Sequence, residues 1–254
     1  MNLSAEQILE NLEIHKQFIK DYIQGPRQQQ CLDLIDELGE NYAIAPASSK
    51  TWYHNAFPGG YVAHVNNVIN VALHQKQFYE SIGGNIDFTD EELVFAALFH
   101  DLGKIGDGEK PNYLPQTDNW RKEKLQEQYT NNPDLQYMLI PDRSLFVLQS
   151  KGIRVSEKEF LGIRLHDGVF DEANKSYFFN YVETSKLKTN IVYILHVADF
   201  LASKMEYDVA KSNTVAKPKL VLEKKANNFQ QAKAKAMPKM ETGGLKSVMD
   251  NFFD

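Results

Sequence analysis

The sequence predicts an all-α fold for residues 1–210, followed by a flexible tail. Three observations support this prediction. Apolar residues recur mostly at the three- and four-residue spacing of a buried helix face. The breaks between these runs fall at glycine and proline, which end helices. Only residues 177–183 (YFFNYVE) are aromatic and apolar enough to suggest a strand, and no internal repeat is visible.

The expected helices are defined by their apolar spacing and by the residues that stop them. The first ends before Gly25–Pro26, and the second ends at Gly39. Thr89 and the acidic residues after it are typical of a helix start, and Gly103 ends that helix. In order, the expected helices cover about residues 8–24, 27–40, 60–82, 90–102, 142–151, 156–167 and 187–209, with a loop at 48–60 and an irregular stretch at 105–135.

Composition divides the chain into two chemically different parts. With 254 residues, 43% of them hydrophobic, the chain is long enough for one large core. Residues 1–210 carry 19 Lys and Arg against 30 Asp and Glu, whereas residues 211–254 carry nine lysines against four acidic residues. The lysine-rich part lacks a sustained apolar period, so burial cannot order it. We therefore expect a helical domain over 1–210, a flexible basic linker over 211–243 and a short apolar peptide over 244–254.

The same sequence disfavours several classes of protein. The N-terminus has neither the basic start nor the apolar run of a signal peptide, and the longest apolar run, LVFAALF, is too short to cross a bilayer. The single cysteine, Cys31, excludes an internal disulfide and fits a reducing compartment. The excess of acidic residues disfavours a broad surface for duplex nucleic acid. We expect a cytoplasmic protein without membrane contact.

Two adjacent ionisable residues, His100 and Asp101, end the apolar run of the fourth expected helix. Their burial costs free energy unless a metal ion or a capping network satisfies them. His64 on the third helix and Asp199 on the last would complete a site of two imidazoles and two carboxylates. Such a donor set suits Mn²⁺, Fe²⁺, Co²⁺, Ni²⁺ or Mg²⁺. An ion of this kind polarises phosphoryl oxygens and lowers the pKa of a bound water.

The ordered set His64, His100–Asp101 and Asp199 resembles the H…HD…D signature of the HD superfamily of metal-dependent phosphohydrolases. The local sequences FPGGYVAHV, LFHDLGKIG and ILHVADFLASKM are similar as well, over about residues 50–205. The likeness is to the HDxGK branch, which includes 3′–5′ exoribonuclease-type proteins and bacterial and phage hydrolases. It implies an HD-domain helical bundle, four metal ligands, and hydrolysis of a phosphoester or phosphoanhydride bond. The expected substrate is a nucleotide or short oligonucleotide, in the cytoplasm of a bacterium or a phage-infected host.

The resemblance also implies roles for residues near the four ligands. Lys104 stands where that branch has the lysine after the HD pair, and it either contacts a substrate phosphate or is a surface lysine. His166 lies where dinuclear members have further histidines, but residues 139–148, where another is usual, contain none. One ion is therefore expected rather than two, and His166 binds a weak second ion, donates a proton or contacts phosphate. The expected catalytic residues are Asp101, Lys104 and His166.

Other polar residues near these motifs are candidates for substrate binding. Arg143, at an expected helix start, is either an anion-binding residue or an exposed charge at the cap. His54 and Asn55, just before the third helix, are expected to line the pocket. His15 and His74 lack such a context, so we expect them at the surface or at its boundary.

The C-terminal sequence LKSVMDNFFD resembles the clamp-binding peptides of T-even-like phage proteins, and also a degenerate sliding-clamp box. Aromatic and apolar anchors at the end of a flexible leash suit docking into a hydrophobic groove. In the alternative, the phenylalanines pack on the protein's own core. The expected anchors are Leu245, Met249, Phe252 and Phe253.

Together these features favour a hydrolase that attacks phosphorus with a metal-activated water, and two alternatives stay open. An HD-type scaffold would act mainly as an adaptor on a replication or transcription clamp, although the intact ligand set disfavours that role. An HD-type di-iron oxygenase would need about six protein ligands. The sequence offers five such residues at best.

Overall fold

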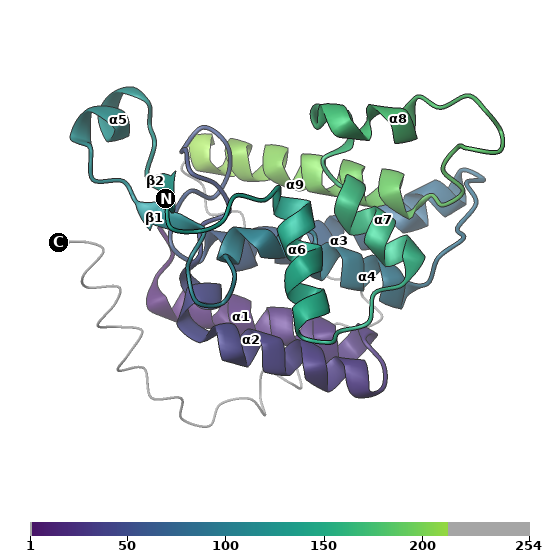
Figure 1. The fold of residues 1–254 in the computed structure, drawn as a ribbon, viewed down its shortest axis with the longest axis horizontal. Coiled ribbons are helices and arrows are strands. Elements are labelled where there is room, and N and C mark those ends of the chain that lie inside the picture. Colours follow the sequence, from purple (N-terminus) through teal and green to yellow (C-terminus); the bar gives the residue numbers. More distant parts are fainter. Residues whose placement is uncertain (1, 213–254) are drawn as a thin grey trace.

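A computed structural model describes residues 2–212 of the protein. Within this range the fold is all-α, as predicted, with one small two-stranded sheet (Figure 1). The long helices are α1 (Ala5–Tyr22), α2 (Pro26–Ile44), α3 (Gly60–Ser81), α4 (Asp90–Phe99), α6 (Ile140–Ser150), α7 (Glu157–Leu165) and α9 (Ile191–Ser212). The short elements are η1 (Leu102–Ile105), β1 (Tyr113–Pro115), α5 (Asn119–Lys124), β2 (Tyr129–Asn131), η2 (Gly168–Phe170), η3 (Glu172–Asn174) and α8 (Lys175–Phe178).

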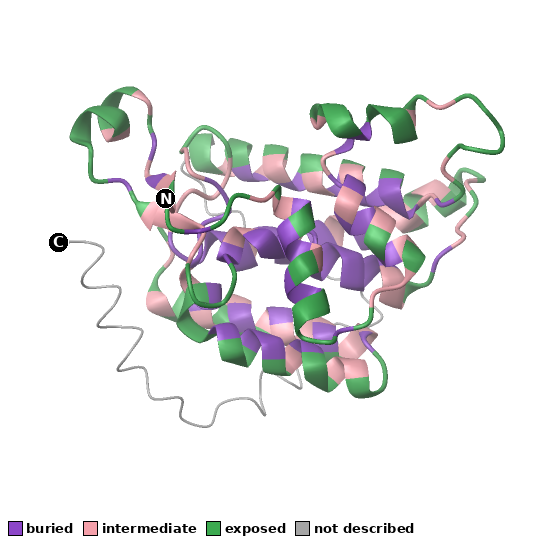
Figure 2. Cartoon of the chain, in the orientation of Figure 1, coloured by how far each residue is buried: buried purple, intermediate pink, exposed green. Residues whose placement is uncertain are grey.

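Helix α3 lies at the centre of the fold. It packs against α9, α4, α1 and α2, and the buried residues gather on α3 and α4 in Figure 2. Every residue of α4 from Leu93 to Phe99 is buried, so this helix is enclosed by its neighbours on all sides. Because His100 and Asp101 follow directly, α4 carries both ionisable residues into the interior.

Three helices begin with reciprocal capping boxes. Ser4, Thr89 and Ser156 each accept a hydrogen bond from the backbone N–H three residues later, and the Gln or Glu side chain there accepts one in return. The predicted cap at Thr89 is confirmed. Such caps satisfy N–H groups that a helix leaves unpaired and contribute about 1 kcal/mol each. They fix the starts of α4 and α7, both of which end at a candidate ligand, His100 and His166.

The strand prediction for residues 177–183 is wrong. Its first two residues end helix α8, and the rest is a loop in which Phe179 and Tyr181 are exposed. Aromatic residues favour strands only where a neighbouring strand offers a packing surface, and within residues 2–212 no strand pairs with this stretch. The sheet lies instead in the stretch predicted to be irregular, where β1 and β2 pair antiparallel with Tyr113 opposite Asn131.

Helix α2 extends beyond its predicted end. Gly39, expected to stop the helix, instead kinks it with a φ of 51°, and the helix resumes as far as Ile44. The turn after the kink buries Tyr42, whose hydroxyl donates to Nε2 of His15 on α1 at 2.7 Å. His15 is completely buried, so its prediction as a surface or boundary residue is wrong.

Three further predictions concern membrane spans, the single cysteine and the C-terminal region. Among residues 2–212 no helix combines the length and apolarity needed to cross a bilayer. Cys31 is buried and carries a free thiol. Most of the expected linker and the whole apolar peptide lie outside the described residues, and so do the expected anchors Leu245, Met249, Phe252 and Phe253.

Candidate metal centre

Four segments of the chain deliver the candidate ligands. His64 lies in the second turn of α3, His100 and Asp101 connect α4 to η1, and Asp199 lies in α9. His166 directly follows α7. His64 and His100 are completely buried, whereas the Asp199 side chain keeps 20% of its surface exposed. Residues more than 130 positions apart in the sequence therefore meet at one place.

The close packing of α6 explains why a glycine, Gly103, follows soon after the His–Asp pair. A Cβ at Gly103 would lie 2.3 Å from the carbonyl oxygen of Ile140, so α6 approaches η1 this closely only because the side chain is absent. The Gly103 N–H donates to the Ser144 hydroxyl at 2.8 Å, and that hydroxyl lies 3.1 Å from the His100 carbonyl oxygen. Helix α6 thus holds the turn that aims both candidate ligands inward.

Each histidine of the centre has its Nδ1 atom occupied. Nδ1 of His100 and Nδ1 of His166 each donate at 2.8 Å to the carbonyl oxygen three residues earlier. Nδ1 of His64 lies 3.0 Å from a carboxylate oxygen of Glu206. These bonds select the tautomer that leaves Nε2 as the free nitrogen. The Nε2 atoms of His64 and His100 are buried and have no hydrogen-bond partner.

The free nitrogens face two carboxylates. His64 Nε2 lies 3.0 Å from Asp199 Oδ1 and 3.8 Å from Asp101 Oδ2. His100 Nε2 lies 3.4 Å from Asp101 Oδ2 and 4.0 Å from Asp199 Oδ1. Separations of this size occur between ligand atoms that share one ion at about 2.1 Å from each. Because the two nitrogens lack hydrogen-bond geometry with these oxygens, this buried cluster could hold a metal ion.

The electrostatics of the cluster also favour a cation. Burial by itself lowers the pKa of His64, but the carboxylates of Glu206 and Asp199 outweigh it and raise that pKa to about 10. At His166 burial is likewise outweighed, first by Asp167 and then by Asp101, and the pKa rises to about 9. The acidic side chains therefore attract positive charge into this largely buried cluster. Protons on the imidazoles are one source of that charge, and a divalent cation is another.

Lys104 is part of the cluster rather than a surface lysine. Its Nζ atom lies 2.6 Å from Asp101 Oδ2, and only 14% of its side chain is exposed. Burial alone would raise the pKa of Asp101, but Lys104 and then His100 hold it well below its usual range. Asp101 is therefore ionised, with one oxygen bound to Lys104 and directed at the histidines.

Glu206 is a functional candidate that the sequence reasoning missed. It is 6% exposed, and besides its bond to His64 it accepts a hydrogen bond from the Asn67 amide at 2.7 Å. A carboxylate in this position sets the tautomer and the orientation of a ligand histidine. The signal in the sequence is its spacing, because seven residues after Asp199 return to the same face of α9.

A cavity of about 610 Å³ opens beside the centre and shares His54 and Lys104 with it. The ring centroids of His54 and His64 are 4.4 Å apart, and the buried Nε2 of His54 has no hydrogen-bond partner. Burial, followed by the positive charges of His64 and Lys104, holds the pKa of His54 well below its usual range. A neutral imidazole therefore separates the cavity from the candidate ligands.

Two predicted substrate-binding residues, Arg143 and Asn55, are not among the residues that line this cavity. Arg143 is 3% exposed and donates to the Gln136 carbonyl oxygen, so the alternative of an exposed cap charge is wrong. Asn55 has a φ of 44°, and its carbonyl oxygen accepts from the Ala47 N–H at 3.1 Å, which shapes the loop before α3. Binding of substrate by Arg143 and Asn55 stays a prediction.

No protein-family model, curated protein or solved structure matches the chain. The side chains therefore define the class of the site. It is a buried cluster of histidine and carboxylate donors next to a lysine and an open cavity. The single cysteine of the chain, Cys31, is outside the cluster, which separates the site from the cysteine-rich sites of structural zinc.

Proposed function

We propose that the protein is a metal-dependent phosphohydrolase of the HD type. The observation that carries the proposal is the meeting of His64, His100, Asp101 and Asp199, whose facing nitrogen and oxygen atoms are 3.0–4.0 Å apart. These are the residues that the HD signature aligns. Lys104 adds a fixed positive charge at the edge of the cluster that faces the cavity.

The proposed cofactor is one divalent ion. A set of two histidines and two carboxylates suits Mn²⁺, Fe²⁺, Co²⁺, Ni²⁺ or Mg²⁺. When bound, such an ion supplies a Lewis acid for a phosphoryl oxygen and lowers the pKa of a water molecule. His64, His100, Asp101 and Asp199 would hold it, and Glu206 would orient His64 from behind.

The chain's own residues supply the other requirements of phosphoryl hydrolysis. Lys104 presents its ammonium group between the ligands and the cavity, where it offsets negative charge on the phosphoryl group in the transition state. His166 Nε2 lies 3.6 Å from Asp101 Oδ1, the oxygen that Lys104 does not bind. From this side of the carboxylate, an imidazolium can donate its proton to the leaving oxygen.

The proposed substrate is a nucleotide or a short oligonucleotide. The cavity volume is typical of a small-molecule site. Its lining combines aromatic side chains with two lysines and contains no acidic residue, which suits an aromatic base that carries phosphate. The acidic balance of residues 1–210 agrees with a small or single-stranded substrate rather than a duplex.

One observation favours the oxygenase alternative. Among residues 2–212, the donor groups that could hold a metal ion contain seven residues, because His54 and Glu206 join the five recognised from the sequence. Glu206, however, already accepts hydrogen bonds from His64 and Asn67, which suits a supporting role better than coordination of a second iron. Iron analysis with an EPR spectrum separates these functions, since a coupled di-iron centre that consumes O₂ would support the oxygenase.

A metal and substrate screen tests the proposed function. The full chain is stripped with chelator, reloaded with Mn²⁺, Co²⁺, Ni²⁺, Fe²⁺ or Mg²⁺, and incubated with nucleotides and short oligonucleotides. We expect release of phosphate or of shortened products with at least one ion, and none with the chelator. A chain that binds no ion stoichiometrically, or that hydrolyses none of these substrates with any ion, would overturn the proposal.

A further inference from the structure

The cavity beside the metal centre has two walls from distant parts of the chain. Trp52 and Tyr53 come from the loop between α2 and α3, and Phe200 and Tyr207 come from α9. All four keep open surface, with exposures of 45%, 54%, 41% and 39% respectively. Exposed apolar side chains that gather around one cavity are typical of a ligand-binding groove.

The spacing on α9 explains how one helix serves both the cluster and the cavity. Asp199 and Glu206 are seven residues apart and share one face. Phe200 and Tyr207 each follow one of these acidic residues, and one residue turns an α-helix by about 100°. The helix therefore directs its acidic residues at the histidines and its aromatic residues into the adjoining cavity.

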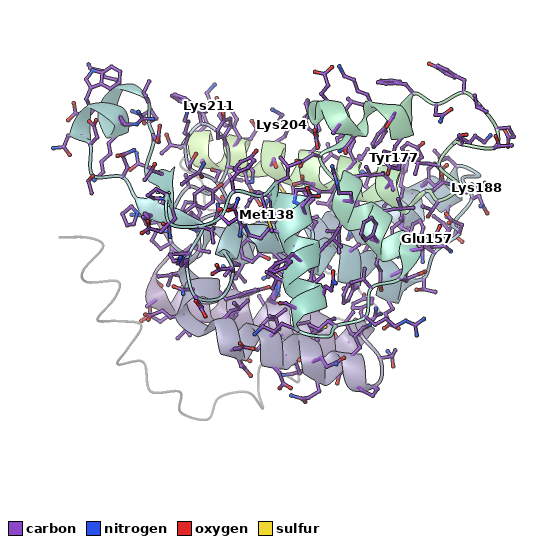
Figure 3. All side chains as sticks on the ribbon, viewed as in Figure 1. Met138, Glu157, Tyr177, Lys188, Lys204 and Lys211 are labelled. Atoms are coloured by element: carbon purple, nitrogen blue, oxygen red, sulfur yellow. The ribbon has the colours of Figure 1, made fainter. Side chains whose placement is uncertain are left out.

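Charge in the cavity comes from two lysines at different depths. Lys104 lies at the inner end, where it binds Asp101 at 2.6 Å. Lys204 lies on α9 (Figure 3). Its Nζ atom is 5.2 Å from the centroid of the Phe200 ring, and within residues 2–212 it forms no ion pair. No acidic residue is among those that line the cavity. A cavity of this kind, in a domain with excess acidic residues, is suited to an anionic ligand.

We propose that this cavity is a nucleotide-unit site, with the base stacked on Trp52 and enclosed by the Phe200–Tyr207 wall. The reacting phosphate then lies at Lys104, next to the cluster, and Lys204 contacts a second phosphate of the same ligand. Aromatic stacking accepts any base because every base has a π-face. The inference rests on the proposed function in one respect, namely that the phosphate end of the ligand points toward the metal centre. Binding of the base is a separate property that can be measured without turnover.

The same chemistry is present in a free nucleotide and in the terminal unit of a single strand. Lys204 discriminates between ligands with one phosphate and those with two, both for free nucleotides and for the end of a single strand. A sugar phosphate without a base would reach both lysines but would leave the aromatic walls without a partner. These three ligand types therefore form the arms of the test.

Tryptophan fluorescence of the full chain tests the proposal directly. The chain has two tryptophans, and Trp120 lies on α5 and is not among the residues that line the cavity, so Trp120→Phe leaves Trp52 as the only tryptophan reporter. The probes are α,β-methylene-ADP, a phosphorothioate-linked dinucleotide and ribose 5-phosphate. We expect the first two to quench Trp52 with saturation and ribose 5-phosphate to leave it unchanged. Tighter binding of α,β-methylene-ADP would identify the ligand as a free nucleotide, and tighter binding of the dinucleotide would identify it as the end of a single strand.

Matched variants assign the walls and the outer lysine. Phe200→Ala should weaken binding of both base-containing probes about ten-fold, within the range of one base–aromatic contact. Lys204→Ala should weaken α,β-methylene-ADP about five-fold and leave adenosine binding unchanged. Lys211→Ala removes the same charge seven residues further along α9, outside the cavity lining, and should change neither value (Figure 3).

The failures of the two proposals are distinguishable. If nucleotides quench Trp52 with saturation but none of them is hydrolysed, the nucleotide-unit site stands and the proposed phosphohydrolase function is overturned. The opposite result is hydrolysis of nucleotides in a protein whose Trp52 is quenched equally by ribose 5-phosphate, or whose nucleotide binding is unaffected by Phe200→Ala. It would overturn the nucleotide-unit site and leave the proposed phosphohydrolase function standing.

Discussion

Helix α3 contributes to two buried histidine sites that behave in opposite ways. His15 of α1 packs against Asn66 of α3, and His64 lies two residues earlier on the same helix. Both imidazoles are completely buried. Burial lowers the pKa of His15 to about 4, whereas at His64 neighbouring carboxylates overcome burial and raise the pKa to about 10. The same depth of burial thus produces opposite shifts.

The partners of the two rings explain the difference. His15 donates from Nδ1 to the Asn66 side-chain oxygen at 2.9 Å and accepts at Nε2 from the Tyr42 hydroxyl at 2.7 Å, so both nitrogens are satisfied by neutral groups. His64 uses Nδ1 for Glu206 and leaves Nε2 without a hydrogen bond beside Asp199. A candidate ligand is therefore identified by an unsatisfied nitrogen next to carboxylates and not by burial.

The largest effect on activity is expected at Asp101. Asp101→Asn keeps the shape of the side chain but removes a charged donor, so bound metal and hydrolysis should fall together, with activity lower by about three orders of magnitude or more. Asp36→Asn is the control, because Asp36 is an exposed aspartate of α2 that pairs with Lys16 of α1 and belongs to none of the donor groups. Metal analysis and initial rates provide the readout. Equal activity in the two variants would remove Asp101 from the centre.

A smaller effect separates Lys104 from the metal ligands. Lys104→Ala removes the ammonium group that binds Asp101 and faces the cavity. We expect kcat/KM to fall by about one to three orders of magnitude while the metal content stays unchanged. Metal analysis beside steady-state kinetics checks this result. If metal and activity are lost in parallel, the lysine is needed to position Asp101 and does not act on substrate.

Glu206 sharpens the contrast between the two histidines, because it is the partner that His15 lacks. Glu206→Gln keeps the size of the side chain but weakens its hold on His64 Nδ1, so metal affinity should fall by about ten- to one-hundred-fold. Metal titration followed by dialysis measures the change. Glu37→Gln, at an exposed position on α2, is the control. An unchanged affinity would show that His64 needs no orienting carboxylate.

The His15 site should influence stability and leave chemistry unchanged. Its pKa in the folded protein, about 4, lies below the value of 6.5 expected for the unfolded chain, so the unfolded state binds the proton more readily. The associated stabilisation is complete above pH 6.5, falls as the pH drops from 6.5 to 4, and amounts to about 3 kcal/mol. Urea unfolding of wild type and His15→Gln at pH 7.5, 6 and 5 should show a steeper loss in wild type. If the free energy of unfolding falls equally with pH in wild type and in His15→Gln, the assignment of a neutral, buried His15 is contradicted.

Sequence patterns predict local features of this protein better than long-range partners. The capped α4, the His–Asp pair at its end and Gly103 are neighbours in the chain, so one short stretch specifies them. Tyr42 meets His15 only because α2 continues beyond a kink at Gly39, which no local rule indicates. The sheet was missed for the same reason, since its two three-residue strands are defined by each other.

The candidate site divides in the same way. His64, His100, Asp101 and Asp199 were expected together because each stands in a distinctive local sequence. Glu206, Lys204 and the aromatic walls were not, because their roles depend on how α9 is rotated against α3 and on where the loop before α3 folds. Helical spacing from Asp199 narrows the choice of residues, but only the packed structure selects among them.

The most direct test of the central claim compares two histidines on one helix. His64 has a buried nitrogen facing two carboxylates, whereas His74, ten residues further along α3, is half-buried and bonds the Asn70 carbonyl oxygen at 2.7 Å. Wild type, His64→Ala and His74→Ala are dialysed against Mn²⁺ or Co²⁺, with circular dichroism to confirm that each is folded. We predict about one ion per chain in wild type and His74→Ala, and at least ten-fold weaker binding in His64→Ala. Equal metal content in a folded His64→Ala protein, or none in wild type, would contradict the account.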